Sequence, residues 1–285
     1  MSSLMEEPSV VGEAPIQQNN SLPSVPLVPT NDRVDITEPG TDYFGEQLKD
    51  KKQGVLRIGF ININSLSKHK ATAKYDSIRS SLAAGEIDII GLAETNKCWH
   101  LMESENTWKE VSKTWWKDSH SSISYNSRDI SDSVYLPGGT ITTAINEYSH
   151  RIAGSGVDGT LLGRWSWITL RGKQGIKTTF FTLYRPCKST TSDNTTYSQH
   201  IRYLNVCRRN ECPQEAILKD AATAIKHLQD QGHQIVLMAD MNSKVTDGNI
   251  QRWAHTLDLY EYITTEHGDG VETYNNGRHP IEAFL

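Results

Sequence analysis

The fold class of this chain is decided by the stretch Val55-Leu56-Arg57-Ile58-Gly59-Phe60-Ile61-Asn62-Ile63-Asn64. Its apolar run, residues 55–63, has the composition of a strand that is buried on both faces. A helix-compatible stretch at 71–82 follows, and then a second run of the same kind at 87–92. A strand, a helix and a strand in this order indicate an α/β protein.

The rest of the chain supplies more strands, in two groups with helices between them. Residues 215–228 place apolar side chains at the 3.6-residue spacing of a helix that packs on one face. This arrangement predicts a four-layer α/β/β/α sandwich, in which two packed mixed sheets are flanked by helices. We expect strands at 123–125, 140–145, 165–170, 178–184, 235–239 and 281–285, and helices at 196–206, 215–228 and 250–257.

Composition divides the chain into two parts. Residues 1–52 are acidic and rich in proline, without helical or strand periodicity, and we expect them to be a disordered tail. Residues 53–285 form the expected domain. The first 50 residues hold two basic and nine acidic side chains, a charge of −7, and the remaining 27 basic and 25 acidic ones give +2. A nearly neutral domain can still grip phosphates locally, so bulk charge does not decide whether DNA is the substrate.

Two further classes of protein are disfavoured by the sequence. No apolar stretch is long enough to span a membrane, and the start of the chain lacks the pattern of a signal peptide, so we expect an intracellular protein, nuclear or cytoplasmic. The four cysteines form no CxxC pair and are too sparse for a disulfide scaffold. We expect them to be buried or idle thiols.

Polar side chains follow three of the apolar runs at the point where each strand should end. Asn62 and Asn64 end the first, Glu94 follows the second, and Asp240 and Asn242 end a later one. Residues two apart on a strand face the same way, so each pair can face one cleft. Carboxylate and amide oxygens suit Mg²⁺ or Mn²⁺. Each residue taken singly is more often the cap of a turn, and only the convergence of three favours a metal site.

Four ordered motifs carry a resemblance to a known family. The chain resembles the endonuclease/exonuclease/phosphatase family over roughly residues 54–285, and the layout of its segment 184–214 is similar to endonuclease domains of non-LTR retrotransposons, which are attached to reverse transcriptases. The family has an α/β four-layer sandwich fold. The motifs are Arg57-Ile58-Gly59-Phe60-Ile61-Asn62-Ile63-Asn64-Ser65-Leu66, Asp88-Ile89-Ile90-Gly91-Leu92-Ala93-Glu94-Thr95, Phe181-Thr182-Leu183-Tyr184-Arg185-Pro186 and Val236-Leu237-Met238-Ala239-Asp240-Met241-Asn242.

The resemblance implies roles for the first two motifs. Glu94 would be the carboxylate that binds the metal, and Asn62 would help to hold the metal site and to bind the substrate. Asn64 stands where many members have an acid that contributes to a metal site, so its amide puts a second metal in question. Mg²⁺, or Mn²⁺ in its place, is the implied cofactor.

The later motifs would handle the phosphate. Tyr184 would hydrogen-bond the scissile phosphate, Asp240 would position or deprotonate the attacking water, and Asn242 would bind phosphate oxygens. Arg185 is a candidate contact to a DNA backbone, although long charged side chains are most often simply solvated.

The end of the sequence matches the family less well. Glu282 stands where the family has an aspartate of the catalytic group, and its longer side chain shifts the carboxylate by about one methylene. None of the ten histidines follows Glu282, whereas the family continues to a Ser-Asp-His motif. The resemblance therefore implies a domain that lacks its last strand and this motif.

These observations predict metal-dependent hydrolysis of DNA phosphodiester bonds by a retroelement-type endonuclease domain. DNA is the expected substrate, a reverse transcriptase from the same element is an expected partner, and no membrane is involved. Two alternatives stay open. One is an inactive fragment or nucleic-acid-binding remnant, and the other is a phosphatase of the same fold that acts on phosphorylated lipids or inositols.

Overall fold

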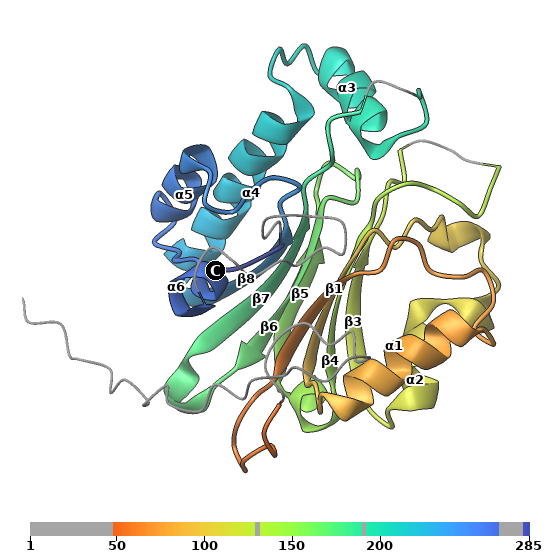
Figure 1. The fold of residues 1–285 in the computed structure, drawn as a ribbon, viewed down its shortest axis with the longest axis vertical. Coiled ribbons are helices and arrows are strands. Elements are labelled where there is room, and N and C mark those ends of the chain that lie inside the picture. The colour runs from red at the N-terminus through yellow and green to blue at the C-terminus, as the bar shows by residue number, and fades with distance from the viewer. Residues whose placement is uncertain (1–47, 129–131, 190–191, 268–281) are drawn as a thin grey trace, which may run out of the picture. The chain divides into compact units, whose positions relative to one another are not determined.

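A computed structural model describes residues 48–128, 132–189, 192–267 and 282–285 (Figure 1). The expectation of a disordered tail falls almost wholly on residues 1–47, and the approach to Glu282 falls on 268–281; both lie outside the described residues. The division at 52/53 stays a prediction. Lys51, on the tail side of that division, contacts Oδ1 of Asp88 through its Nζ at 2.5 Å.

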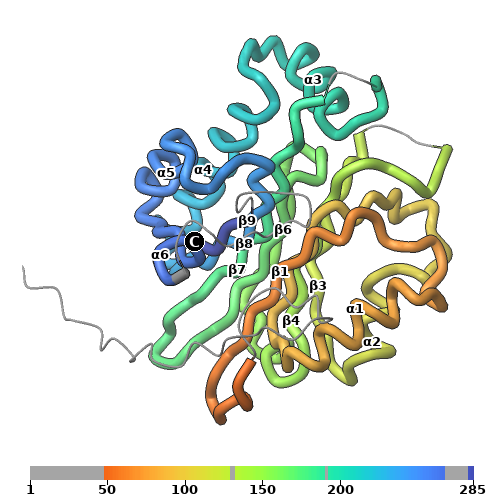
Figure 2. Tube along the Cα trace, viewed as in Figure 1, coloured from red at the N-terminus to blue at the C-terminus, as the bar shows by residue number. Residues whose placement is uncertain are grey.

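The described chain forms two mixed sheets. A four-stranded sheet has the order β1 (Ile58–Asn62), β2 (Ile89–Ala93), β4 (Thr140–Ile145) and β3 (Ser119–Ser124), and its β1–β2 pair is parallel. A five-stranded sheet has the order β5 (Ile152–Val157), β6 (Trp165–Arg171), β7 (Lys177–Tyr184), β8 (His233–Asp240) and β9 (Glu282–Phe284). Its β7–β8 pair is parallel, and β9 runs antiparallel beside β8 (Figure 2).

Helices cover the outer faces of both sheets (Figure 1). The helices α1 (Ala73–Ala84) and α2 (Trp108–Trp115) cover the four-stranded sheet. The helices α4 (Pro213–Asp230), α5 (Gly248–His255) and α6 (Tyr262–His267) cover the five-stranded sheet, and α3 (Thr196–Val206) lies beyond one end of it. The predicted four-layer α/β/β/α sandwich is therefore confirmed. None of the helices in the described ranges is long and apolar enough to cross a membrane.

Each interface between layers has its own apolar core. The 3.6-residue spacing predicted for 215–228 is confirmed, because α4 buries Ile217, Ala221 and Ile225 against the five-stranded sheet. Ile89, Ile168 and Met238 are among the residues that pack between the two sheets. That interface also contains a polar seam, in which the Thr142 hydroxyl lies 2.8 Å from the Thr182 hydroxyl and 2.9 Å from the carbonyl oxygen of Ser166. The sheets are thus joined by hydrogen bonds as well as by apolar packing.

Strand β5 and helix α2 were not predicted. Strand β5 contains glycines at alternate positions, Gly154 and Gly156, where a strand pattern calls for large side chains. The ring of Trp167 occupies that space, since a Cβ added to Gly156 would lie 2.5 Å from it. A neighbouring tryptophan therefore replaces the missing side chains.

Candidate active site

The predicted site residues come together where β1, β2, β7 and β8 end. Nδ2 of Asn62 donates a hydrogen bond of 2.7 Å to Oδ2 of Asp240, although the two residues are 178 positions apart and belong to different sheets. Tyr184 lies beside Asp240 in the parallel β7–β8 register. Glu282 lies on the other side of Asp240, as its partner in the antiparallel β8–β9 register. The bond between Asn62 and Asp240 therefore joins the site across the two sheets.

The backbone at the strand ends is left-handed. Asn64, Glu94 and Asn242 have φ angles of 40°, 53° and 45°. Such angles cost non-glycine residues on the order of 1 kcal/mol or more, and they persist where surrounding contacts hold them. At Glu94 the carbonyl oxygen accepts a hydrogen bond of 2.7 Å from the Ser65 amide. Neighbouring segments thus fix the direction in which each strand-end side chain points.

Asp240 is fully buried, and its only hydrogen-bond donors in the described chain are amides. The backbone N–H and Nδ2 of Asn242 donate to Oδ1 and Oδ2 at 3.0 and 3.2 Å. Burial raises the pKa of Asp240 to about 7, and the carboxylates of Glu94 and Glu282 act in the same direction, while the bonds from Asn242 and Asn62 oppose them. An acid with a pKa near neutrality is suited to accept a proton from water.

Tyr184 joins Asp240 to Glu94. Its hydroxyl is hydrogen-bonded to Glu94, and its side chain is buried. Burial raises the pKa of Tyr184, and the nearby carboxylates of Glu94 and Asp240 raise it further. The phenol therefore keeps its proton and serves as a hydrogen-bond donor, which is the property that a phosphate contact requires.

Arg185 and Asn242 are locked together by the turn that follows β7. Nδ2 of Asn242 donates to the carbonyl oxygen of Arg185 at 2.7 Å, and the buried guanidinium donates from Nη1 to the carbonyl oxygen of Met241 at 2.8 Å. Cys187 is exposed, and its thiol lies 2.7 Å from Oδ1 of Asn242. The sequence gave no sign of this contact, because a lone cysteine past a strand end belongs to no motif.

Two lysines beside the first-sheet part of the site were also missed. Nζ of Lys74 donates to the carbonyl oxygen of Asn64 at 3.0 Å. Lys97 is only 6% exposed, and its ammonium has no hydrogen-bond or ion-pair partner among the described residues. Burial lowers the pKa of Lys97, and the charge of Lys74 lowers it further. A buried cation without an acid is suited to meet an anionic substrate.

The donor set fits Mg²⁺ or Mn²⁺ better than zinc. In the parts of the chain that the structure describes, no three His, Cys, Asp or Glu side chains form a group that could hold a metal ion. Mg²⁺ usually keeps several waters and uses one or two carboxylates together with substrate oxygens. The half-buried Glu94, with Oδ1 of Asn62 nearby in the site, matches that habit. Asn64 is exposed and has the Lys74 ammonium on its carbonyl, and its role as a ligand stays a prediction.

No protein-family model matches this sequence, and no curated protein matches it. Solved structures do resemble its fold. The human Nocturnin catalytic domain with bound sulfate is 14% identical, with 80% of this chain and 81% of that one covered and a TM-score of 0.53. A Neisseria 3' phosphatase, NExo, bound to a product DNA hairpin, is 13% identical over 81% and 86%, with a TM-score of 0.52. An endonuclease/exonuclease/phosphatase family protein from Leptotrichia buccalis is 15% identical over 81% and 87%, with a TM-score of 0.50. The fold of this chain is therefore that of endonuclease/exonuclease/phosphatase proteins.

Proposed function

We propose that this chain hydrolyses phosphodiester bonds of DNA with the help of Mg²⁺ or Mn²⁺. The observation that carries the proposal is the 2.7 Å bond between Asn62 and Asp240, which brings the polar ends of two sheets to one place. In this proposal Glu94 and the side-chain oxygen of Asn62 hold the metal. The metal would polarise the phosphodiester and stabilise charge that develops on its oxygens.

The remaining steps of the proposed reaction are assigned to protein side chains. Asp240 orients the attacking water and accepts its proton, because its raised pKa suits a base that works near neutral pH. Asn242 and Tyr184 would donate to the phosphate oxygens in place of the bonds that they make to Asp240 and Glu94. The carboxylate of Glu282 on the neighbouring strand helps to raise the pKa of Asp240. Lys74 and Lys97 add positive charge beside Asn64, whose carbonyl oxygen Lys74 contacts. In this proposal Asp240 contacts the attacking water, Asn242 and Tyr184 contact the phosphate, and the metal and the two lysines stabilise the developing negative charge.

A DNA substrate is favoured by the similarity in fold to an enzyme solved with a product DNA hairpin. The layout of segment 184–214 supports the narrower proposal of a retroelement endonuclease that works in the nucleus or cytoplasm with a reverse transcriptase from the same element. Co-expression of the two proteins and recovery of a complex on a tagged endonuclease would support that partner. Recovery of the endonuclease alone would count against it.

The test of the activity is nicking of supercoiled plasmid in Mg²⁺, Mn²⁺ or EDTA. We expect metal-dependent nicking that Glu94→Gln and Asp240→Asn each reduce by about 10²- to 10⁴-fold. Glu110→Gln and Asp118→Asn make the same carboxylate-to-amide changes at partly exposed positions outside the site and should leave the rate unchanged. Full activity of either site variant would contradict the proposed roles.

The same preparations distinguish the two alternatives. A folded protein that binds DNA without cutting it under any metal condition is a binding remnant. Release of phosphate from inositol phosphates, without nicking, identifies a phosphatase. Folding is checked by circular dichroism before either conclusion is drawn.

A further inference from the structure

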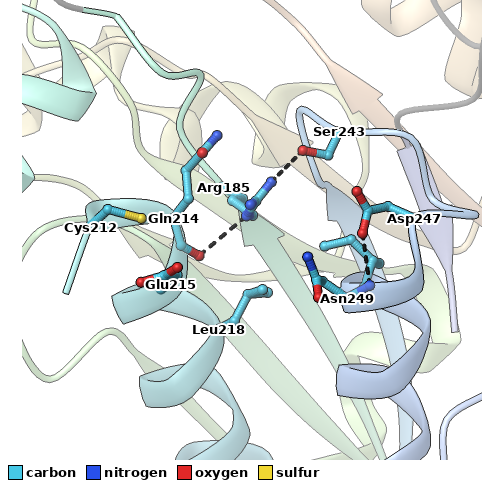
Figure 3. Close-up of a pocket in the computed structure, with 9 residues that line it drawn as sticks. Arg185, Cys212, Gln214, Glu215, Leu218, Ser243, Asp247 and Asn249 are labelled. Carbon is cyan, nitrogen blue, oxygen red and sulfur yellow. Dashed lines mark hydrogen bonds between the residues drawn. The ribbon is translucent and has the colours of Figure 1, made fainter.

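A cavity of about 360 Å³ lies beside the active site, between the end of β7, the start of α4 and the turn that leads into α5 (Figure 3). Arg185 belongs to both places. Its backbone N–H donates to the carbonyl oxygen of Asp240 at 2.9 Å, whereas its guanidinium lines the cavity. A ligand that contacts Arg185 in the cavity would therefore lie next to Asp240, the general base of the proposed reaction. The lining consists of Arg185, Cys212, Gln214, Glu215, Leu218, Ser243, Asp247, Asn249 and Ile250.

The guanidinium of Arg185 is held in place and retains a free donor. The residue is 9% exposed. Nη1 donates to Ser243 Oγ at 2.7 Å as well as to Met241, and Nε lies 3.3 Å from the carbonyl oxygen of Gln214 (Figure 3). Nη2 donates no hydrogen bond to any part of the chain that the structure describes. A hydrogen-bond donor that is held in place and has no acceptor in the protein is prepared to bind a ligand.

Two carboxylates of the cavity lining, those of Asp247 and Glu215, supply acceptors. Oδ1 of Asp247 accepts a hydrogen bond of 2.7 Å from the Asn249 amide, and its second oxygen has no donor within the described ranges. The carboxylate of Glu215 has no hydrogen-bond donor there either. One guanidinium and two carboxylates give the lining a net charge of −1, which disfavours a phosphate or sulfate as the occupant.

The remaining walls include apolar surface. Leu218 and Ile250 line the cavity between the polar groups. Apolar walls with a few convergent donors and acceptors bind a flat heterocycle well, because its faces contact the apolar atoms while its edge is hydrogen-bonded. The lining therefore matches a neutral, planar ligand that both donates and accepts.

We propose that this cavity is a nucleobase subsite that takes an unstacked guanine. Nη2 of Arg185 would donate to its O6 acceptor, and Glu215 or Asp247 would accept from its ring N–H and amino group. Thymine has no amino group and meets the carboxylates less well. The inference rests on the proposed function, since the base would belong to a nucleotide next to the scissile phosphate and would have to leave the stack.

Cys212 allows the proposal to be tested without catalysis. Its thiol lines the cavity, whereas Cys207 is exposed at the end of α3, outside the cavity, and serves as an internal reference. Alkylation of each thiol by iodoacetamide would be followed by mass spectrometry on the full chain in EDTA, with guanosine or thymidine as the probe. Guanosine should slow alkylation of Cys212 by a factor of 1 + [L]/Kd, about fivefold at roughly four times Kd, and leave alkylation of Cys207 unchanged. Thymidine should protect less.

Glu215→Gln and the control Glu110→Gln complete the design. Both glutamates lie on helices, Glu215 exposed and Glu110 partly exposed, but only Glu215 lines the cavity. Guanosine protection of Cys212 should weaken in Glu215→Gln and persist in Glu110→Gln. Equal protection by guanosine and thymidine, or no protection at millimolar guanosine, would overturn the proposal. Because the assay needs no metal and no cleavage, failure of the nicking test would not mimic its failure.

Discussion

Two fully buried aspartates of this molecule, Asp158 and Asp240, have opposite surroundings. Asp158 receives Nε and Nη2 of Arg164 at 2.8 and 3.0 Å and the Thr160 hydroxyl at 2.7 Å. Asp240 receives amide donors only, and the charges nearest to it are the carboxylates of Glu94 and Glu282. The guanidinium of Arg164 neutralises the carboxylate of Asp158, whereas the carboxylate of Asp240 is hydrogen-bonded only by neutral amides.

The pKa values follow from this difference. Burial alone would raise the pKa of Asp158, but the guanidinium of Arg164 and the Thr160 hydroxyl outweigh it and hold the pKa below its usual range. Burial raises the pKa of Asp240 to about 7, the carboxylates of Glu94 and Glu282 act in the same direction, and the amide bonds from Asn242 and Asn62 do not outweigh them. A buried charge that is paired with an opposite charge, as in Asp158, contributes to the stability of the fold. Where a charge is left unbalanced, the site is prepared to receive a cation or a proton.

Replacement of the unbalanced acid should give the largest effect. Asp240→Asn is expected to lower the nicking rate by about 10²- to 10⁴-fold. Its free energy of unfolding in EDTA should change little, because removal of the buried charge offsets the hydrogen bond that the new NH2 group cannot accept. The two measurements are initial nicking rates and urea unfolding. A variant that loses stability as well as activity would show that Asp240 is a structural residue like Asp158.

Removal of the cation from the balanced cluster should affect stability instead. Arg164→Met leaves Asp158 buried without its partner, and Arg164 also bridges to Asp220 at 2.7 Å. We expect a loss of about 3–5 kcal/mol in the free energy of unfolding, measured with urea. The control is Arg209→Met, since Arg209 also pairs with Asp220 but is 24% exposed, and its loss should be about 1 kcal/mol or less. Equal losses in the two variants would break the comparison.

A histidine in the balanced region gives a test by pH. His200 is 2% exposed, and burial, followed by the charge of Arg164, lowers its pKa from 6.5 to about 3. The unfolded chain takes up this proton below about pH 6.5, and the folded chain only near pH 3, so stability falls as the pH falls between these values. The slope attributable to His200 is up to about 1.4 kcal/mol per pH unit. Urea unfolding of His200→Asn between these limits should show a shallower slope than the native chain, and identical slopes would rule out this role.

The smallest expected effect concerns the amide that contacts Asp240. Cys187→Ala removes the thiol that contacts Oδ1 of Asn242, and we expect roughly a fivefold fall in kcat from the loss of about 1 kcal/mol of orienting hydrogen bond. Stability should not change, because Cys187 is exposed. Cys187→Ser should restore most of the rate. Equal rates for the native and Ala proteins would show that the contact does not orient Asn242.

Much of the site was predictable because strand geometry is local. Residues two apart on a strand share a face, and this rule predicted that Asp240 and Asn242 lie together. The structure joins them by hydrogen bonds, but through a left-handed turn at Asn242 beyond the end of β8. Lys97 was not predictable in the same way. Its burial depends on the segment around Tyr135, which pairs with it from a distant part of the sequence. Long-range coverage of this kind leaves no pattern around the residue itself.

Helices and strands were likewise predictable only where their sequence pattern is local. Strand β4 and helix α3 begin and end at the predicted residues, because their apolar or amphipathic patterns are complete within themselves. Strand β3 begins at Ser119, four residues before the predicted strand, because its first half is polar and only partly buried. Strand β5 was not predictable because glycines replace large side chains in it, and the ring of Trp167 on β6 fills the space beside them.

The separation of Asn62 from Asp240 also bears on how the protein is made. Contacts between residues far apart in sequence form late in folding, since a long loop must close before they do. A nascent chain synthesised through β7 would already carry Glu94 and Tyr184, but the partner of Asn62 would not yet exist. The candidate site would therefore be complete only after β8 has been synthesised and the two sheets have docked.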